Sequence, residues 1–344
     1  MGYRTKHREA AHYCFNCLHG FAKKETLDNH IELCYKQRTQ AIKFPKKPEE
    51  KEVFFKNIKK QLPAPFIIYA DFEAFTTKID EPQHGNTTMY QRHIPSGFGY
   101  MVVSTAPQYT KEPVIYRGEN VIDTFLERLI EEHQQINTIL SYEQPMVMTA
   151  EDVRQHERAT ECFICNQLLG AERPVQDHDH LTGKYRGAAH SECNLAFKHQ
   201  RFNNSKKNPS YIVPVVFHNL RGYDGHHLMS GIGKFKNRRI SCIANNSERY
   251  ITFGLSGLQF IDSLQFTNSS LERLVDNLTR EEFQFLHKYI DGQQKQDLML
   301  RKGVFPYDYV DKPTKLEEKR LPPKQEFYSK LYDEDISDSD YQHA

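Results

Sequence analysis

The chain has 344 residues, more than one ordinary domain needs, and 46 Lys and Arg against 45 Asp and Glu leave a net charge of +1. This balance excludes a uniformly basic nucleic-acid-binding protein, so any DNA affinity must come from local patches. No apolar run of about eighteen residues and no apolar secretory stretch at the N-terminus occur. We therefore expect an intracellular protein that is not secreted and has no transmembrane segment. Cys242 stands alone in an apolar segment and is expected to be a buried strand residue.

The other six cysteines fall into two clusters with histidines, as in intracellular metal sites. The first cluster has the ligand spacing of a small zinc finger, and its residues are Cys14, Cys17, His30 and Cys34. A hairpin and a following helix can hold four such ligands in a tetrahedron around Zn²⁺. Phe21 and Leu27 occupy the positions of the two apolar residues that pack such a finger. The sequence thus predicts a C2H2-like finger, with CCHC ligands, over residues 8–36.

Two roles stay open for this finger. Lys23, Lys24 and Glu25 occupy the start of its helix, which is where DNA-reading fingers face bases. One finger covers only about three base pairs, too little for specificity alone. The segment therefore suits either a DNA-docking finger or a structural or protein-contact element. The Lys-rich and Pro-broken residues 37–62 that follow are expected to form a linker.

An α/β pattern follows the linker. Residues 63–75 (PAPFIIYADFEAF) form an apolar run that predicts a buried strand with carboxylates at its tip. Helical periodicity marks residues 121–140 and 269–278. Further strands are expected at residues 97–104, 112–118, 211–219, 240–246, 249–255 and 258–266. This order of strands and helices predicts an α/β layer fold, and the acidic residues 333–344 are expected to be a flexible tail.

Residues 148–206 interrupt this pattern because they are polar and contain no long apolar strand. They hold the second ligand set, of a closed structural type, with Cys162, Cys165, His190 and Cys193. Between its halves lies VQDHDHLTGKYRGAAH, and Asn194 follows directly. Neighbouring carboxylate and imidazole groups suit phosphodiester hydrolysis. A carboxylate and an amide oxygen can hold Mg²⁺ or Mn²⁺, and a neutral histidine can deprotonate water.

Residues 162–198 resemble the recombination endonuclease VII family, within the HNH or His-Me finger nucleases. The resemblance rests on C-x2-C, DHDH, RG and a paired-ligand motif that ends in Cys-Asn, and it departs from the family at His190, where cysteine is usual. By position it implies Mg²⁺ ligation by Asp177 and Asn194, general-base action by His178, a second-site role for His180 and a phosphate contact by Arg186. The alternative is a zinc-stabilised DNA-binding insert that has lost cleavage.

A second set of acidic residues begins at Asp71 and Glu73, which alternate along FIIYADFEAF. The strand period of two puts both side chains on one face, close enough to share a divalent cation. Their expected partner is Asp224, at the end of the turn that follows the strand VPVVFHN. Three or four such carboxylates can clamp two metal ions, which would activate water at a 3′ terminus.

From about residue 64 onward the chain resembles the proofreading exonuclease of protein-primed family B DNA polymerases, of the Maverick/Polinton, linear-plasmid or virus type. YADFEA matches the first exonuclease motif, HNLRGYD the second, and FIDSLQF the Ser-Leu segment. The resemblance implies a ribonuclease-H-like fold with Asp71, Glu73 and Asp224 as metal ligands. It also implies that a frayed single-stranded 3′ end is held by Asn219, Tyr223, Ser263 and Leu264.

Two departures weaken this resemblance. Ala74 stands where the family tends to have a small hydroxyl residue. The third motif, Tyr-x3-Asp on a helix, is matched in letters by Tyr307 and Asp311, but the prolines around FPYDYVDKP predict a loop, so we interpret the match as accidental. We therefore expect the exonuclease to be weak or inactive. The polymerase motifs are not found, and no polymerase activity is expected.

The leading hypothesis is the DNA-binding, metal-dependent nuclease portion of a mobile-element polymerase. Its predicted parts are a finger at 8–36, a linker at 37–62, an exonuclease domain at 63–147 and 207–332, a zinc-bound ββα-metal insert at 148–206, and a tail at 333–344. One rival is a structure-directed endonuclease that uses the exonuclease fold as a platform, and another is a catalytically silent domesticated DNA-binding or interaction protein. Expected partners are DNA, as single-stranded 3′ ends or branched or duplex forms, and polymerase parts or a terminal protein. The expected location is the nucleus.

Overall fold

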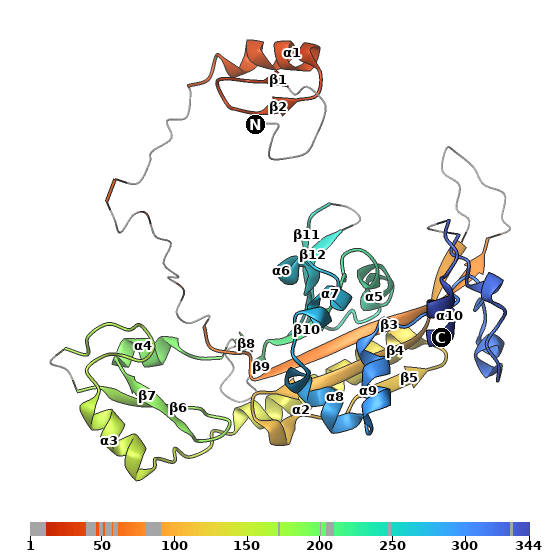
Figure 1. Cartoon of the computed structure of the whole chain (residues 1–344). Coiled ribbons are helices and arrows are strands. Elements are labelled where there is room, and N and C mark those ends of the chain that lie inside the picture. Colours follow the sequence, from red (N-terminus) through yellow and green to blue (C-terminus); the bar gives the residue numbers. More distant parts are fainter. Residues whose placement is uncertain are drawn as a thin grey trace. The chain divides into compact units, whose positions relative to one another are not determined.

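The computed structural model describes residues 12–38, 46–47, 51, 57, 61–79, 91–170, 173–199, 201–203, 210–246, 249–330 and 333–344. The chain divides into two compact units, residues 1–56 and residues 57–344 (Figure 1). Most of the predicted linker lies outside the described residues. Among the described helices, none combines the length and the apolar character needed to cross a membrane.

The first unit is a hairpin followed by a helix, as the sequence predicts. Strands β1 (His12–Tyr13) and β2 (Gly20–Phe21) pair antiparallel, and helix α1 (Lys24–Cys34) follows. The helix buries none of its residues, and Phe21 is only half-buried, with its ring 4.8 Å from the ring of His30. So small a core cannot stabilise an independent domain without a further cross-link.

The second unit is built on a seven-stranded mixed sheet with the order β11-β12-β13-β10-β3-β4-β5. The strands are β3 (Phe66–Lys78), β4 (Gln91–Ser104), β5 (Val114–Arg117), β10 (Val213–Phe217), β11 (Ile240–Ala244), β12 (Tyr250–Leu255) and β13 (Leu258–Asp262). Strand β10 runs parallel to β3 on one side and to β13 on the other, and the remaining pairs are antiparallel. The α/β prediction is therefore confirmed at the level of a large mixed sheet with helices.

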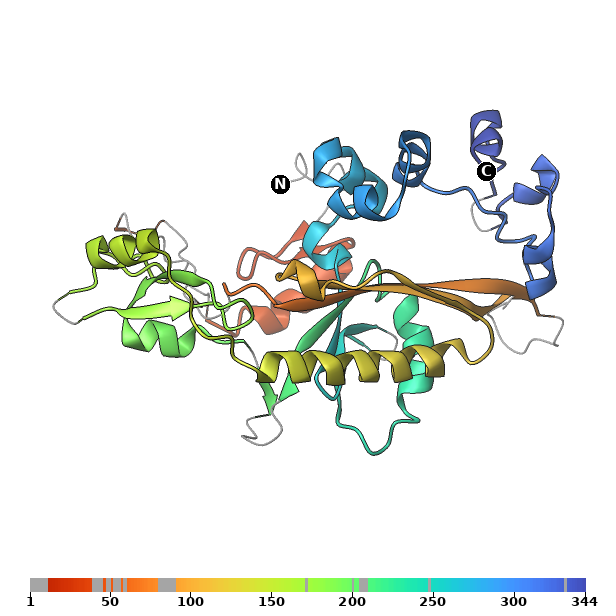
Figure 2. The ribbon, with the colours of Figure 1, turned by 90° about the horizontal axis from the view of Figure 1, so that it is seen from below.

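Helices α2 (Val121–Ser141) and α5 (Asp224–Ile232) lie on the same side of β3 (Figure 2). Apolar side chains spaced three or four residues apart along α2 face the sheet, which is the pattern of an amphipathic helix. The ring of Phe125 lies 4.8 Å from that of Phe72 on β3, and both are buried. Each such buried side chain stabilises the fold by about 1.5–3 kcal/mol.

Short helices follow the sheet toward the C-terminus: α6 (Leu264–Thr267), α7 (Leu271–Asp276), α8 (Gln284–Tyr289), α9 (Gln293–Leu300) and α10 (Asp338–His343), with 3-10 turns η4 (Pro107–Tyr109), η5 (Arg280–Glu282), η6 (Pro313–Glu317) and η7 (Lys324–Phe327) along the unit. Helix α10 lies within the predicted acidic tail. The Ser337 hydroxyl accepts a hydrogen bond from the Asp340 amide at 3.0 Å, and the acidic first turn suits the positive helix end.

The polar segment between α2 and β10 has its own elements: α3 (Ala150–Arg158), β6 (Val175–His178), β7 (Tyr185–Ala189), α4 (Ser191–Ala196), β8 (Arg201–Asn203) and β9 (Ser210–Tyr211). Strands β6 and β7 pair antiparallel, so β6, β7 and α4 form a ββα arrangement. Its core is small, with five buried residues: Cys162, Ile164, Leu169, Ala188 and Ala189. This segment, like the first unit, buries too little apolar surface to be stable by packing alone.

Cys242 lies on a strand, as expected, but it is exposed, so the prediction of a buried residue is wrong. Strand β11 is the last strand of the sheet and pairs only with β12. All five of its residues are exposed. An apolar pattern predicts a strand, but whether another layer covers that strand depends on the tertiary structure.

Candidate metal and nuclease sites

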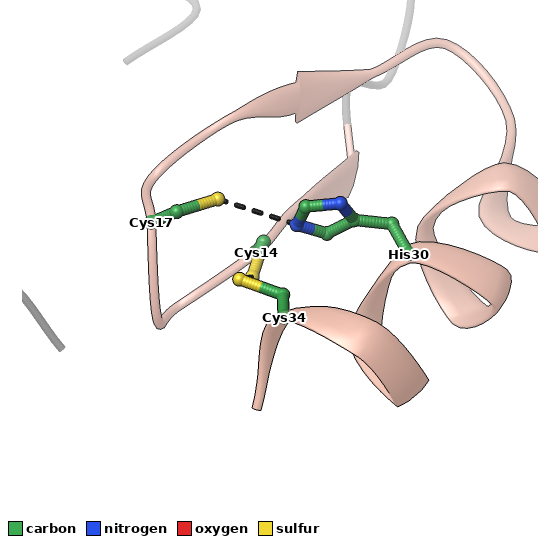
Figure 3. A group of neighbouring side chains, drawn as sticks. All are labelled: Cys14, Cys17, His30 and Cys34. Atoms are coloured by element: carbon green, nitrogen blue, oxygen red, sulfur yellow. Dashed lines mark hydrogen bonds between the residues drawn. The ribbon is translucent and has the colours of Figure 1, made fainter. Parts of the chain in front are cut away.

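The first Cys/His cluster converges as the spacing predicts (Figure 3). The sulfur atoms of Cys14 and Cys34 are 3.8 Å apart, and the Cys17 sulfur lies 3.3 Å from Nε2 of His30. A tetrahedral site with Zn–S bonds of about 2.3 Å has ligand atoms about 3.8 Å apart. The donor set and its spacing therefore fit Zn²⁺, with two ligands beside the hairpin turn and two on α1.

The second cluster is equally compact. His190 Nδ1 lies 3.5 Å from the Cys165 sulfur and 3.8 Å from the Cys193 sulfur. Its other nitrogen, Nε2, donates to the Leu168 carbonyl at 3.0 Å, which fixes the ring with Nδ1 toward the sulfur atoms. In the part of the chain that the structure describes, these two clusters are the sets of three or more ligand groups whose atoms lie within 4.8 Å of one another. Both could bind zinc.

The thiols of the second cluster differ in their pKa values. Burial opposes ionisation of Cys162, but backbone N–H groups, foremost that of His190, outweigh it and lower the pKa of its thiol to about 7. Burial and the neighbouring Cys165 and Cys162 sulfurs raise the pKa of Cys193 to about 12. Thiolates as close together as the ligands of one metal ion repel one another, and a cation that binds all of them relieves this repulsion.

Strand β6 carries the two residues predicted at the centre of the endonuclease site, Asp177 and His178. Asp177 is 2% exposed, and both of its carboxylate oxygens accept hydrogen bonds from Arg186 on β7, at 2.5 and 3.1 Å. Arg186 in turn lies over the Phe197 ring, 5.1 Å from its centroid. The sequence assigned the aspartate to metal and the arginine to phosphate, and the structure brings these two side chains together as a bidentate ion pair.

The histidines of the same motif adjoin this pair. The rings of His178 and His180 are 4.8 Å apart, and His180 Nδ1 lies 3.3 Å from a Glu143 carboxylate oxygen. Burial, followed by the charge of His180, lowers the pKa of His178, which favours a neutral imidazole at pH 7. Asn194 is on α4, which contacts β6. Asp177, His178 and Asn194 therefore come from two elements that pack against each other.

Strand β7 connects the second Cys/His cluster to this motif. The Phe163 amide, next to Cys162, donates to the Ala188 carbonyl at 3.0 Å. Gly187 pairs with Asp177 in register, and a Cβ atom there would lie 2.6 Å from the Phe163 ring. Only glycine fits this position without displacing the ring. Disruption of the cysteine cluster should therefore distort the strand that faces Asp177.

The carboxylates of the larger sheet lie elsewhere on their strand than expected. Asp71 and Glu73 are exposed on one face of β3, with Phe72 buried between them, as the period of two predicts. They are not at a strand tip, however, because β3 continues to Lys78 by pairing with β4. Pairing of β3 with β10 ends at Tyr69, so both carboxylates lie just beyond the shorter neighbour.

Asp224 begins α5 and completes this acidic group. Burial, then the Asp71 charge, raises the pKa of Asp224 to about 7. Partial desolvation also raises the pKa of Asp71 and of Glu73, to which the Asp71 charge contributes. A carboxylate whose ionisation is opposed by a neighbouring negative charge is a suitable ligand for a divalent cation. A site for two metal ions about 3.5–4 Å apart needs carboxylates that are more widely spaced than those around a single ion.

We expect Asp224→Asn to stabilise the folded protein at alkaline pH. An unfolded aspartate has a pKa of about 3.9, so between pH 4 and 7 the folded state holds more protons and the free energy of unfolding falls as pH rises. Asparagine does not ionise, so it removes this fall in the free energy of unfolding. The gain should grow from pH 5.5 to pH 8 and reach on the order of a few kcal/mol, measured by urea denaturation without divalent cations. Asp291→Asn, at an exposed site, is the control, and an equal gain at both pH values would contradict the assignment.

The ends of β10 and β13 meet because these strands are parallel and Phe217 is in register with Asp262. The buried Asp262 carboxylate accepts hydrogen bonds from the amides of Asn219, at 2.9 Å, and Leu264, at 3.0 Å. Ser263 donates to the Phe217 carbonyl at 3.0 Å. The motif analysis named Asn219, Ser263 and Leu264 but not Asp262, which positions them. Its place in FIDSL, directly before the Ser-Leu pair, was the available signal.

Tyr223 and Tyr307 both lie at the acidic group. The Tyr223 hydroxyl is 2.8 Å from His93 Nδ1, and burial, then the Asp224 charge, raises the pKa of Tyr223 to about 12. Residues 307–309 form a turn, which confirms the predicted loop. Nevertheless, Thr76 on β3 donates to the Tyr307 carbonyl at 2.6 Å, and the charges of Glu73 and Asp71 add to burial in raising the Tyr307 pKa. The interpretation of Tyr307 and Asp311 as an accidental match to the third motif did not anticipate that Tyr307 lies beside the acidic group.

Comparison with known proteins adds one match. Residues 140–210 match the model of the recombination endonuclease VII family, and they enclose the second Cys/His cluster, Asp177, His178 and Asn194. No curated protein and no solved structure matches the chain. The segment is therefore a nuclease-like module, similar to recombination endonuclease VII, set between α2 and β10 of a larger α/β unit.

Proposed function

We propose that the module within residues 140–210 is a Mg²⁺-dependent DNA endonuclease. The observation that carries this proposal is the family match over a segment in which Asp177 and His178 share β6 and Asn194 lies on the helix packed against it. The second Cys/His cluster would hold a structural Zn²⁺ that supports the motif from the other side of β7.

In this proposal His178 takes a proton from the attacking water on an imidazole nitrogen, while Asp177 and Asn194 supply the oxygen ligands that Mg²⁺ prefers. A bound Mg²⁺ would stabilise the negative charge that develops on the phosphate. His180 beside His178 serves as the second histidine of the site. All four groups come from the segment that matches the family.

The Asp177–Arg186 ion pair adds a condition to this mechanism. Both oxygens of Asp177 are engaged by the guanidinium, so metal ligation by Asp177 requires Arg186 to shift. A DNA phosphate offers the guanidinium an equivalent bidentate acceptor. DNA binding and metal ligation should therefore favour each other, with Arg186 passing from the carboxylate to the phosphate.

The proposal is tested by incubating the full chain with supercoiled plasmid and with branched and linear duplex DNA, with and without Mg²⁺. We expect Mg²⁺-dependent nicks, and a preference for branched DNA would indicate a structure-directed endonuclease. DNA binding without nicks under Mg²⁺ or Mn²⁺ would instead favour the silent DNA-binding alternative.

A second candidate activity belongs to the acidic group of the sheet, for which we propose binding of single-stranded 3′ ends and two-metal 3′–5′ hydrolysis. It is favoured by the position of Asp71 and Glu73 on one face of β3 and by the Asp71 charge, which raises the pKa values of Glu73 and Asp224. Descent from a protein-primed family B polymerase with a ribonuclease-H-like exonuclease domain is supported by an antiparallel run β5-β4-β3 followed by two parallel neighbours, β10 and β13. The first unit is proposed as its DNA-docking finger.

We expect digestion at this site to be slow or undetectable. Three carboxylates organise one cation well and a second one poorly, and two-metal hydrolysis depends on both ions. Asp71→Ala should abolish any 3′ digestion without a large change in DNA affinity, because phosphate contacts from Lys and Arg supply most of that affinity. The assay follows a 5′-labelled oligonucleotide over time. Rapid digestion by the unaltered chain would show that a further ligand is present, and Tyr307 and Asp311 would be substituted next.

A further inference from the structure

A cleft of about 90 Å³ separates the nuclease-like module from the sheet. Its lining comes from the end of α2, the DHDH loop, β7, the residues after α4, strands β8 and β9, and Leu62. Figure 1 labels α2, α4, β7, β8 and β9. A buried site needs roughly 10–15 Å³ for one water, so this cleft holds several waters or one phosphate group.

The lining of the cleft is rich in basic side chains. Among the residues that the structure describes, the Lys198 side chain has no hydrogen bond or ion pair. Arg201 lies 5.4 Å from the Tyr211 ring centroid and donates to its hydroxyl at 3.4 Å, so its charge has no acidic partner there. The one lining carboxylate, Glu143, is engaged by His180 at 3.3 Å. The cleft therefore carries a net positive charge.

His199 adds a neutral donor to this lining. Its ring forms no hydrogen bond to any described residue, although it is half-buried. Burial lowers the pKa of His199 to about 4; the Asp179 charge acts in the opposite direction, and the Arg186 charge adds to the lowering. A neutral imidazole keeps one N–H donor at physiological pH, which can donate to a ligand or a water in the cleft.

We propose that this cleft binds a backbone phosphate of the DNA strand that the module cleaves. Lys198 and Arg201 supply charge, and His199 donates a hydrogen bond. The inference rests on the proposed endonuclease function, because His180 and Arg186 border both the cleft and the cleavage motif. A DNA strand bound at Asp177 and His178 would therefore continue over the cleft to β8 and β9. The cleft would in this way hold the DNA between the module and the larger sheet.

The test measures DNA binding by fluorescence anisotropy, using the full chain with His178→Ala and no added divalent cation so that nothing is cut. The double variant K198Q/R201Q is compared with K319Q/R320Q, which removes the same charge from two exposed residues without ion pairs in the described part. We expect K198Q/R201Q to raise the Kd about tenfold or more and to reduce the salt dependence of log K by about two. The control pair should change the Kd by less than about twofold.

Equal effects of the two double variants would overturn the proposal, since they would reflect net charge alone. A competition arm with dAMP, at ionic strength matched with NaCl, identifies the source of the phosphate. If the cleft binds a DNA backbone phosphate, dAMP should displace the labelled DNA no more than NaCl of the same ionic strength does. Stronger displacement by dAMP would overturn the proposal and would indicate a site for a free phosphate monoester. Nicking by the chain with an unaltered His178 is scored separately, so loss of the cleft effect with nicking intact contradicts this inference alone.

Discussion

His178→Ala is expected to remove Mg²⁺-dependent nicking, with the rate reduced by about 10²–10⁴-fold, the usual contribution of a positioned general base. The imidazole is on β6 beside Asp177, and alanine at this position cannot accept the proton from water. Initial rates of plasmid relaxation at saturating Mg²⁺ measure the effect. Because His178 is in neither of the Cys/His clusters found among the described residues, the zinc content of the variant should equal that of the unaltered protein.

The matched control is His287→Ala, at an exposed position on α8, which should nick at the normal rate. Asp177→Ala should also abolish nicking, but it leaves Arg186 without its partner, so its folding must be checked by circular dichroism. Nicking that survives both His178→Ala and Asp177→Ala would place the catalytic site elsewhere in the chain.

Loss of the second Cys/His cluster is expected to unfold the nuclease-like module. Structural Zn²⁺ in small domains contributes about 10–16 kcal/mol of apparent binding free energy, comparable to or larger than the whole stability of a typical domain. Among the residues that the structure describes, the module's own apolar cluster has five buried members, and Cys162 is one of them. Cys162→Ser should therefore reduce zinc from two ions per chain to one, abolish nicking and expose residues 148–206 to proteases.

The matching variant Cys14→Ser should also lose one zinc ion, but it should keep nicking, because its cluster belongs to the other compact unit. Elemental analysis and limited proteolysis distinguish the two outcomes. One zinc ion in the unaltered protein would mean that the first unit is not a zinc finger. Two ions in Cys162→Ser would show that the second cluster does not hold metal as assigned.

The sequence by itself determined both Cys/His clusters, because ligand spacing along a hairpin and a short helix is a local property of the chain. His190 and Cys193, three residues apart on and just before α4, could be paired with Cys162 and Cys165 without any knowledge of the fold. The same holds for the strand periodicity of Asp71 and Glu73, since alternation depends only on the extended backbone. The endonuclease resemblance, also local, was found again by the family match.

Contacts between distant segments were decided only by the tertiary structure. Asp262 and Asn219 meet because two parallel strands end in register, and no local pattern around either residue predicts this contact. Tyr307 reaches the acidic group through a turn that docks on Thr76, more than two hundred residues earlier in the chain. Long-range pairs of this kind depend on which strands become neighbours and on where pairing stops. The exposure of Cys242 was missed for the same reason: a strand's own residues do not reveal whether another layer covers it.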